Sequence, residues 1–334
     1  MLNRSIIAAA ALAAVSSAAL AQSNVTIYGL IDQGVIKGNG GTATNPGALG
    51  TSKAWTLGQA STSRLGFRGT EDLGGGLSAQ FQIEHRLNPD TGAQNSANAF
   101  WNGRSYVQLT SKAVGAVYLG REYTPSFNVQ VKSDPFGNDG VGQAGSAALW
   151  GNYQAPDAIG NGSRTSNTVG YKSPVLMGGL TINAAVGLSE ATGLGRVQGI
   201  NAEYAQGPLY LGLSYEQVKN GSYDGQGQTS FAVHYDLGYI KPIFYYAQGK
   251  TGTNGSVKAN TWMLAATAPL AGGTVKFMYY DLDSDVNSAD RSKVGLGYNY
   301  PLSKRTNLYA DFGQAKQTAK TNNSAYALGV KHVF

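Results

Sequence analysis

Arginine residues alternate with apolar residues in several short segments of the sequence. In SRLGFRG, Arg64 and Arg68 fall on the opposite side of an extended chain from Leu65 and Phe67. The same alternation places Glu84, Arg86, Arg104, Arg164 and Lys172 on the polar face as well. The candidate site residues among these and the first two arginines are Arg64, Arg68, Glu84, Arg104 and Arg164. Arginine stays charged when crowded and offers a fixed fork of donors, so a row of arginines on one face of a sheet favours anions.

Two acids, Asp134 and Asp139, lie in a stretch of about forty residues, 124–163, that shows no clear secondary structure of its own. A loop of that length is usually functional or disordered, and its aromatic and apolar residues argue against disorder. We expect the two acids to face the arginines across a narrow space. The alternatives are that each arginine pairs with a carboxylate of its own wall, and that the loop is external and mobile.

Residues suited to catalysis are sparse and scattered. The chain has no cysteine, and its three histidines, His85, His234 and His332, lie in well-separated segments. The G-x-S-x-G spacing of a nucleophile elbow is absent, and no helix follows the GGGLSAQ turn as it would follow a phosphate-binding loop. We therefore predict that the protein is not an enzyme and needs no cofactor.

Metal ions and nucleic acid are also poor fits to the sequence. The segment DLDSDVNSAD (281–290) carries four acids but lacks the Gly at the bend and the closing Glu of a calcium loop. We expect no dedicated metal site there, only adventitious Ca²⁺ binding. Basic residues are not interleaved with aromatic ones, so nucleic acid is not an expected partner.

The charged residues are carried by segments with a hydrophobic period of two. LSAQFQIEHR and LTINAAVGL alternate strictly between apolar and polar or small residues. Seven short connections rich in Gly, Pro or Ser alternate with eight longer polar ones. This arrangement predicts sixteen antiparallel strands of about ten residues each, with short turns at one end and long loops at the other.

A closed barrel explains this pattern better than a soluble sandwich. Hydrocarbon leaves no water for the backbone, and a closed antiparallel sheet pairs every N–H and C=O without an edge. The predicted fold class is therefore all-β, a 16-stranded antiparallel transmembrane β-barrel. Tyrosines near strand ends are expected at the membrane interfaces, namely Tyr28, Tyr106, Tyr171, Tyr204, Tyr298 and Tyr326.

The two ends of the chain fit an exported barrel. Residues 1–21 carry Arg4, an apolar stretch and small residues at Ala19 and Ala21, which predicts a cleaved signal peptide. Removing it lowers the formal charge from +6 to +5 and leaves 22–334 as the barrel. The last strand must seal against the first, with alternate side chains toward lipid: Tyr326, Leu328, Val330, His332 and Phe334.

Four segments together resemble Gram-negative general-diffusion porins of the betaproteobacterial and neisserial type, namely 25–34, 61–77, 104–122 and 329–334. DPFGND (134–139) is similar to part of the third loop of these porins, although its acids stand at different positions. The resemblance implies a homotrimer in the outer membrane, with the loop 124–163 folded into the lumen as a constriction. It also implies that the C-terminal residues named above are a signal for the outer-membrane assembly machinery.

Taken with this resemblance, the residues predict a water-filled channel for small hydrophilic solutes and ions. The excess of inward arginines predicts a preference for anions, and outer-membrane lipid and lipopolysaccharide would surround the barrel. A channel specific for organic anions or phosphate remains open, as does, at greater distance, a surface adhesin.

Overall fold

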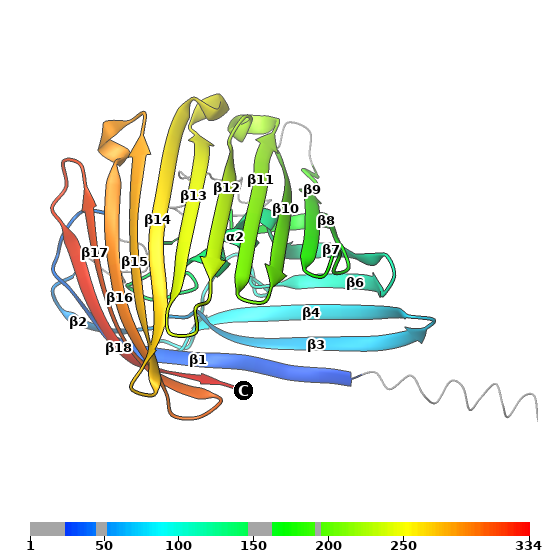
Figure 1. Cartoon of the computed structure of the whole chain (residues 1–334), viewed down its shortest axis with the longest axis horizontal. Coiled ribbons are helices and arrows are strands. Elements are labelled where there is room, and N and C mark those ends of the chain that lie inside the picture. Colours follow the sequence, from blue (N-terminus) through cyan, green and yellow to red (C-terminus); the bar gives the residue numbers. More distant parts are fainter. Residues whose placement is uncertain (1–23, 45–51, 146–161, 191–194) are drawn as a thin grey trace, which may run out of the picture.

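The computed structural model describes residues 24–44, 52–145, 162–190 and 195–334, which form one continuous antiparallel sheet (Figure 1). The predicted signal peptide lies outside these residues. Sixteen long strands build the wall: β1 (Asn24–Gly38), β3 (Ser63–Gly74), β4 (Leu77–Asn88), β6 (Ser105–Ser111), β7 (Gly115–Tyr123), β8 (Arg164–Lys172), β9 (Leu180–Gly187), β10 (Arg196–Gln206), β11 (Leu209–Lys219), β12 (Gly227–Tyr235), β13 (Lys241–Thr251), β14 (Val257–Leu270), β15 (Gly273–Ser284), β16 (Arg291–Pro301), β17 (Thr306–Gln317) and β18 (Asn323–Val333).

Smaller elements occupy the long connections. They are β2 (Trp55–Gly58), β5 (Ala93–Gln94), α2 (Pro125–Ser133) and three single turns of 3₁₀-helix, η1 (Gly221–Tyr223), η2 (Thr253–Gly255) and η3 (Asn287–Ala289). Within the described ranges, no helix has the length and apolar character needed to cross a membrane.

The sheet closes because β1 has long strands on both sides. Its first half pairs with β3, from Asn24↔Thr70 to Leu30↔Arg64. Its second half pairs with β18, from Leu30↔Val333 to Gly38↔Ala325. The predicted sixteen-stranded antiparallel barrel, with alternating short and long connections, is confirmed.

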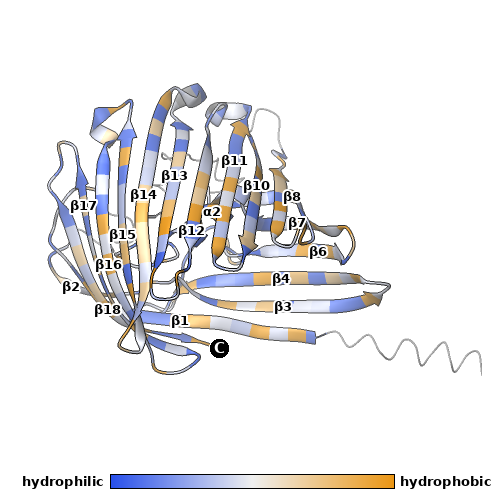
Figure 2. Cartoon of the chain, viewed as in Figure 1, coloured by the Kyte–Doolittle hydropathy of each residue, from blue (hydrophilic) through white to orange (hydrophobic). Residues whose placement is uncertain are grey.

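The two faces of the sheet differ as the alternation predicts. On β11, Leu213 and Tyr215 are 54% and 46% exposed, whereas the intervening Ser214 and the following Glu216 are buried. Figure 2 shows the same alternation of apolar and polar residues along many strands. Exposed apolar and buried polar side chains invert the usual order of a soluble protein, as expected of a wall between lipid and an aqueous lumen.

Two of the tyrosines assigned to the membrane interfaces face the lumen instead. Tyr28 donates a hydrogen bond to Glu84, and Tyr106 donates one to Gln82. Tyr171 and Tyr326, by contrast, are exposed on the outer face. The prediction was wrong for Tyr28 and Tyr106 because nearness to a strand end says nothing about the face, which parity along the strand decides.

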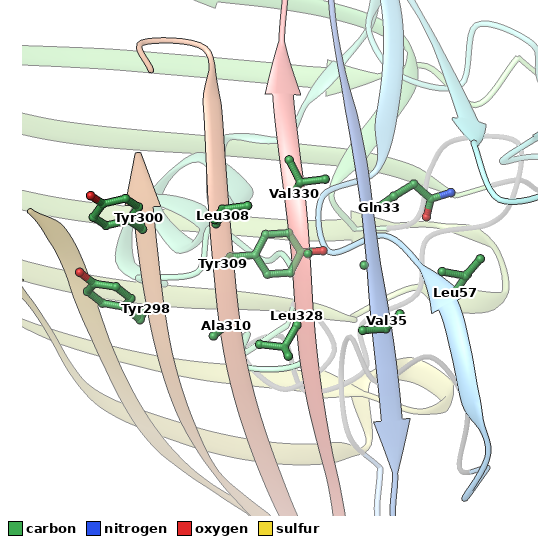
Figure 3. A pocket seen from close by; sticks show the side chains of 12 residues that line it. Gln33, Val35, Leu57, Tyr298, Tyr300, Leu308, Tyr309, Ala310, Leu328 and Val330 are labelled. Carbon is green, nitrogen blue, oxygen red and sulfur yellow. The ribbon is translucent and has the colours of Figure 1, made fainter. Parts of the chain in front are cut away.

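The seam between the first and last strands is packed on its inner side by Tyr309 of β17. Its ring lies across β18 toward β1 (Figure 3), and its hydroxyl donates to Asp32 Oδ1 at 2.7 Å. Gly329 of β18 and Gly34 of β1 leave room for this hydroxyl, since a Cβ on Gly34 would lie 2.7 Å from it. The glycines thus let one aromatic side chain cover three strands.

The C-terminal residue completes the outer side of the seam. Phe334 and Gly29 exchange two backbone hydrogen bonds of 3.0 Å each. The ring of Phe334 covers Gly29, where a Cβ would lie 2.6 Å from the ring and would also collide with the carbonyl oxygen of Arg64. The predicted pairing of the last strand with the first is confirmed, and it extends to Phe334.

Gly29→Ala should therefore weaken the barrel. The new methyl group must displace either the Phe334 ring or the backbone of β3, and overpacking of this kind costs about 1–3 kcal/mol. The temperature at which the folded form unfolds on a semi-native gel should fall. Ile27→Ala, on the same face of the same strand, is the control and should change it little; equal effects would contradict the steric argument.

Candidate functional site

The long connection 124–163 begins with a helix, α2, where the sequence predicted no secondary structure. Thr124 Oγ1 accepts a hydrogen bond from the backbone N–H of Phe127 at 3.3 Å, and Pro125 occupies the first turn of α2. Thr-Pro in this order is a helix-start signal, because threonine caps the free N–H groups and proline has none to lose. Residues 146–161 of the connection lie outside the described part of the chain.

α2 is held against the inner face of β10 to β12 by polar contacts. The backbone N–H of Ser126 donates to Glu216 Oε2 at 3.3 Å, and Asn201 Nδ2 donates to the carbonyl oxygen of Pro125 at 2.9 Å. Lys132 forms an ion pair with Glu203. Because these wall residues alternate with the exposed apolar ones, the described start of the connection lies on the lumen side of the sheet.

Asp134 organises the loop and does not meet the arginines. Its carboxylate accepts backbone N–H groups from Phe136 at 2.9 Å, Asn138 at 3.2 Å and Ala144 at 2.9 Å. Burial raises the pKa of this carboxyl. The three hydrogen bonds and the positive charge of Lys293 act in the opposite direction but do not cancel the rise. The expectation that Asp134 faces the arginine cluster is corrected, because its oxygens are turned into the loop to satisfy the N–H groups of a tight bend.

Asp139, the second loop acid, does reach the arginines. It accepts a hydrogen bond from Ser61 Oγ, which also accepts one from Lys331 Nζ at 3.2 Å. Burial raises the pKa of the Asp139 carboxyl, while the hydrogen bond from Ser61 and the charges of Lys331 and Arg64 oppose the rise. Asp139, Arg64 and Arg164 line one cavity of about 400 Å³ between the loop and the wall.

A third arginine, Arg86, lines the same cavity. It stands directly across from Arg64 in the β3–β4 pairing and forms an ion pair of 2.7 Å with Glu84. Arg86 and Arg164 both donate to the hydroxyl of Tyr123, at 3.2 and 2.8 Å. The Arg164 guanidinium also lies 4.4 Å from the centre of the Tyr123 ring. The tyrosine thus fixes two guanidinium groups side by side.

Arg104 is absent from the lining of this cavity and pairs within the wall. Two of its nitrogens bond to the carboxylate of Glu122 on β7, and Lys172 Nζ reaches the same carboxylate at 3.2 Å. Arg104 therefore pairs with a carboxylate of the barrel wall and not with an acid of the loop, as the alternative interpretation of the arginines had it. Arg68 lies nearer the short turns, with its guanidinium 5.4 Å from the centre of the Tyr28 ring.

Arg86, Tyr123 and Glu122 were absent from the predicted site. Parity along the strands places Arg86 on the face of Glu84, and Glu122 on the face of Tyr118. Tyr123 ends β7 next to the loop and carried no such signal. The structure thus brings Arg64, Arg164, Glu84 and Asp139 to one region, and leaves Asp134, Arg104 and Arg68 with other partners.

Positive charge exceeds negative charge on the inner face of this part of the wall. On β3 to β8 and the residue before β6, the cations named above are Arg64, Arg68, Arg86, Arg104, Arg164 and Lys172. The carboxylates on the same face of these strands are Glu84, Glu122 and, at the short-turn end of β3, Asp72. Such an excess on a wet face raises the local concentration of anions.

Comparison with known proteins agrees with the barrel and its wall. A family model described as Gram-negative porin matches residues 8–320. The chain belongs to this family. The outer membrane porin protein 32 of Delftia acidovorans is 34% identical over 342 residues, with 99% of this chain and 93% of that protein covered.

Two further comparisons cover all or nearly all of the porin. An outer membrane porin protein of Bordetella pertussis is 28% identical, and all of both chains is covered. The solved structure of an anion-selective porin from Comamonas acidovorans matches with a TM-score of 0.79 and 29% identity, over 94% of this chain and 100% of that chain.

The other polar groups of the porin that could do chemistry are dispersed. In the described ranges, no group of three or more His, Cys, Asp or Glu side chains is arranged to hold a metal ion. In the acidic segment 281–290, Asp285 and Asp290 accept backbone N–H groups of Lys258 and Ser284. Adventitious Ca²⁺ binding there stays a prediction from the sequence.

The Arg104–Glu122 pair makes a stability prediction. Glu122 is 3% exposed, so Arg104→Gln leaves a buried carboxylate with Lys172 as its remaining ion-pair partner and should cost about 1–3 kcal/mol. The double variant Arg104→Gln/Glu122→Gln should recover part of the loss. Unfolding temperatures of the three proteins measure this, and a double variant less stable than Arg104→Gln would argue against the pair.

Proposed function

We propose that this porin forms a water-filled channel through the outer membrane, by which small hydrophilic solutes and ions diffuse passively, with anions preferred. A sixteen-stranded barrel encloses a lumen too wide for wall side chains to fill. The printed names of its relatives describe outer membrane porins, one of them anion-selective. The protein resides in the outer membrane of a Gram-negative bacterium as a multi-pass β-barrel.

The arrangement of Arg64, Arg86 and Arg164 opposite Asp139 carries this proposal. Three guanidinium groups border one small cavity, and the facing loop contributes one acid. Charges of opposite sign on opposite sides of a narrow waterway orient polar solutes and hold ordered water, which an apolar solute would have to displace. The surplus of cations then favours anions over cations of the same size.

The loop 124–163 is proposed to narrow the lumen at this level. Support comes from its described part, in which α2 rests on β10 to β12 and Asp139 is tied to Ser61 of the opposite wall. A segment attached at both sides of the lumen leaves the space beside the arginines as the path for solutes.

The porin is further proposed to act as a homotrimer surrounded by lipid and lipopolysaccharide, after recognition of its C-terminal residues by the assembly machinery. The outer face supports such contacts, since Tyr326, Leu328 and Val330 are 59%, 56% and 42% exposed. An apolar hollow of about 670 Å³ lies over β1 and β16 to β18 (Figure 3). Its apolar lining suits contact with a lipid acyl chain or with a neighbouring subunit.

Ion selectivity of the reconstituted protein tests the arginine cluster. Wild type should give an anion-favouring reversal potential in a salt gradient. Arg64→Gln should lower the anion-to-cation permeability ratio roughly fivefold, because one charge at about 4 Å in water is worth about 1 kcal/mol. Arg305→Gln, in an exposed turn, removes the same charge away from the cavity and is the matched control. Cation preference in wild type would refute the proposal.

Asp139 adds a pH dependence with a defined sign. Burial raises the pKa of its carboxyl above the ordinary value, so protonation occurs at a higher pH than for an exposed aspartate. As the pH falls through that pKa, the loop loses a negative charge beside Arg64 and the anion preference should increase. Asp139→Asn should remove this component of a reversal-potential titration; an unchanged titration would assign the pH dependence to other acids.

A further inference from the structure

A row of aromatic and polar side chains crosses the inner wall on the short-turn side of the arginine cluster. Arg68 of β3, Gln82 of β4 and Tyr106 of β6 stand directly opposite one another in the strand pairing. The Gln82 amide joins two tyrosines, since its Nε2 donates to the hydroxyl of Tyr28 and its Oε1 accepts from Tyr106 at 3.1 Å. The two rings are therefore fixed in place by one side chain.

Arg68 differs from the other arginines of the wall. Its side chain is exposed, and none of the ion pairs among the described residues includes it. Its guanidinium lies 5.4 Å from the centre of the Tyr28 ring. Arg104, in contrast, is committed to Glu122. Arg68 thus offers a fork of donors to a solute without first having to release a carboxylate.

The same combination of ring and cation continues along the wall. Lys172 of β8 lies 4.7 Å from the centre of the Tyr118 ring and 5.3 Å from that of Tyr106. The rings of Tyr106 and Tyr118 meet edge to face, with centres 6.1 Å apart. Every ring of this belt, which comprises Tyr28, Tyr106 and Tyr118, has a cation within reach of its face.

The height of the belt is set by strand register. Arg64 pairs with Arg86 in the arginine cluster, and Arg68 pairs with Gln82 four residues further along β3. Four residues of a strand span roughly 13 Å. A solute that leaves the cluster toward the short turns therefore meets the belt next. Short turns face the periplasm in barrels of this kind, so the belt lies on the inward route.

We propose that Tyr28, Arg68, Gln82 and Tyr106 form a second subsite of the channel, which binds planar aromatic carboxylates of the benzoate class. This inference rests on the proposed function, because it requires an open anion channel. The carboxylate is bound by the fork of Arg68, while the ring stacks on the guanidinium plane and the neighbouring tyrosine face. An aliphatic acid of equal charge gains only the ionic contact.

Two other interpretations lead to different results. If the cation–aromatic contacts serve only to hold Arg68 in position, benzoate gains nothing over a non-aromatic acid. If the tyrosines form a slide for sugars, a neutral sugar is retained better than benzoate. The presence of a cation beside each ring favours the aromatic anion, since a sugar slide needs no such charge.

Permeation of two matched acids tests the proposal. The purified porin is reconstituted in a planar bilayer, and reversal potentials are measured with chloride on one side and benzoate or cyclohexanecarboxylate on the other. The two acids carry the same charge and nearly the same size, and only benzoate is planar and aromatic. We expect benzoate to be preferred in wild type by about two- to fivefold, the range of an exposed cation–aromatic contact.

Variants assign the preference to the belt. Tyr28→Leu/Tyr106→Leu should bring the ratio of the two acids close to one, while Tyr106→Phe should retain most of it. Arg68→Lys should keep the ionic contact and lose the stacking component. Tyr171→Leu, on the outer face, is the control and should behave as wild type.

Chloride conductance separates failure of this inference from failure of the channel itself. A variant that conducts chloride as wild type does is folded and open, and its acid ratio is then decisive. A wild-type ratio near one, a ratio that survives Tyr28→Leu/Tyr106→Leu, or stronger current block by maltose than by benzoate would each overturn the subsite. Loss of chloride conductance in wild type would instead overturn the proposed function.

Discussion

The whole structure depends on the need of every backbone amide in hydrocarbon for a partner within the protein. The pairing of β1 with both β3 and β18 meets that need without leaving an edge. Once the sheet is closed, each strand must turn one set of alternate side chains to lipid and the other to the lumen. The charged wall is thus a consequence of closure, because an arginine within a membrane-spanning strand stays hydrated on the inner face and not on the lipid face.

Periodicity, together with the alternation of short and long connections, was enough to predict the barrel, the number of strands and the face of the arginines in the candidate site. It could not predict which acid each arginine meets, since parity fixes the face of a side chain but not its neighbours around the barrel. Arg104 pairs with Glu122 because β6 and β7 are adjacent and their register brings the two side chains together. The prediction for Asp134 was wrong for another reason. The loop bends on itself, and the Asp134 carboxylate accepts hydrogen bonds from the backbone N–H groups of that bend.

The lumen is divided between two kinds of polar wall. Strands β3 to β8 carry guanidinium groups whose charge exceeds that of their carboxylates. Strands β10 and β11 carry Asn201, Glu203 and Glu216, each of which contacts α2. One side therefore fixes the position of the loop and the other acts on passing solutes. The sequence distinguishes these sides only weakly, because both read as alternating polar and apolar residues.

The contact between Phe334 and Gly29 fixes how β18 is aligned with β1. Two backbone hydrogen bonds and one aromatic ring meet at the same glycine. Because side chains on one face recur every second residue, a slip of β18 by two residues would place that ring over Ile27 or Ile31, whose side chains occupy the space that Gly29 leaves empty. One glycine thus sets the stagger with which the cylinder closes.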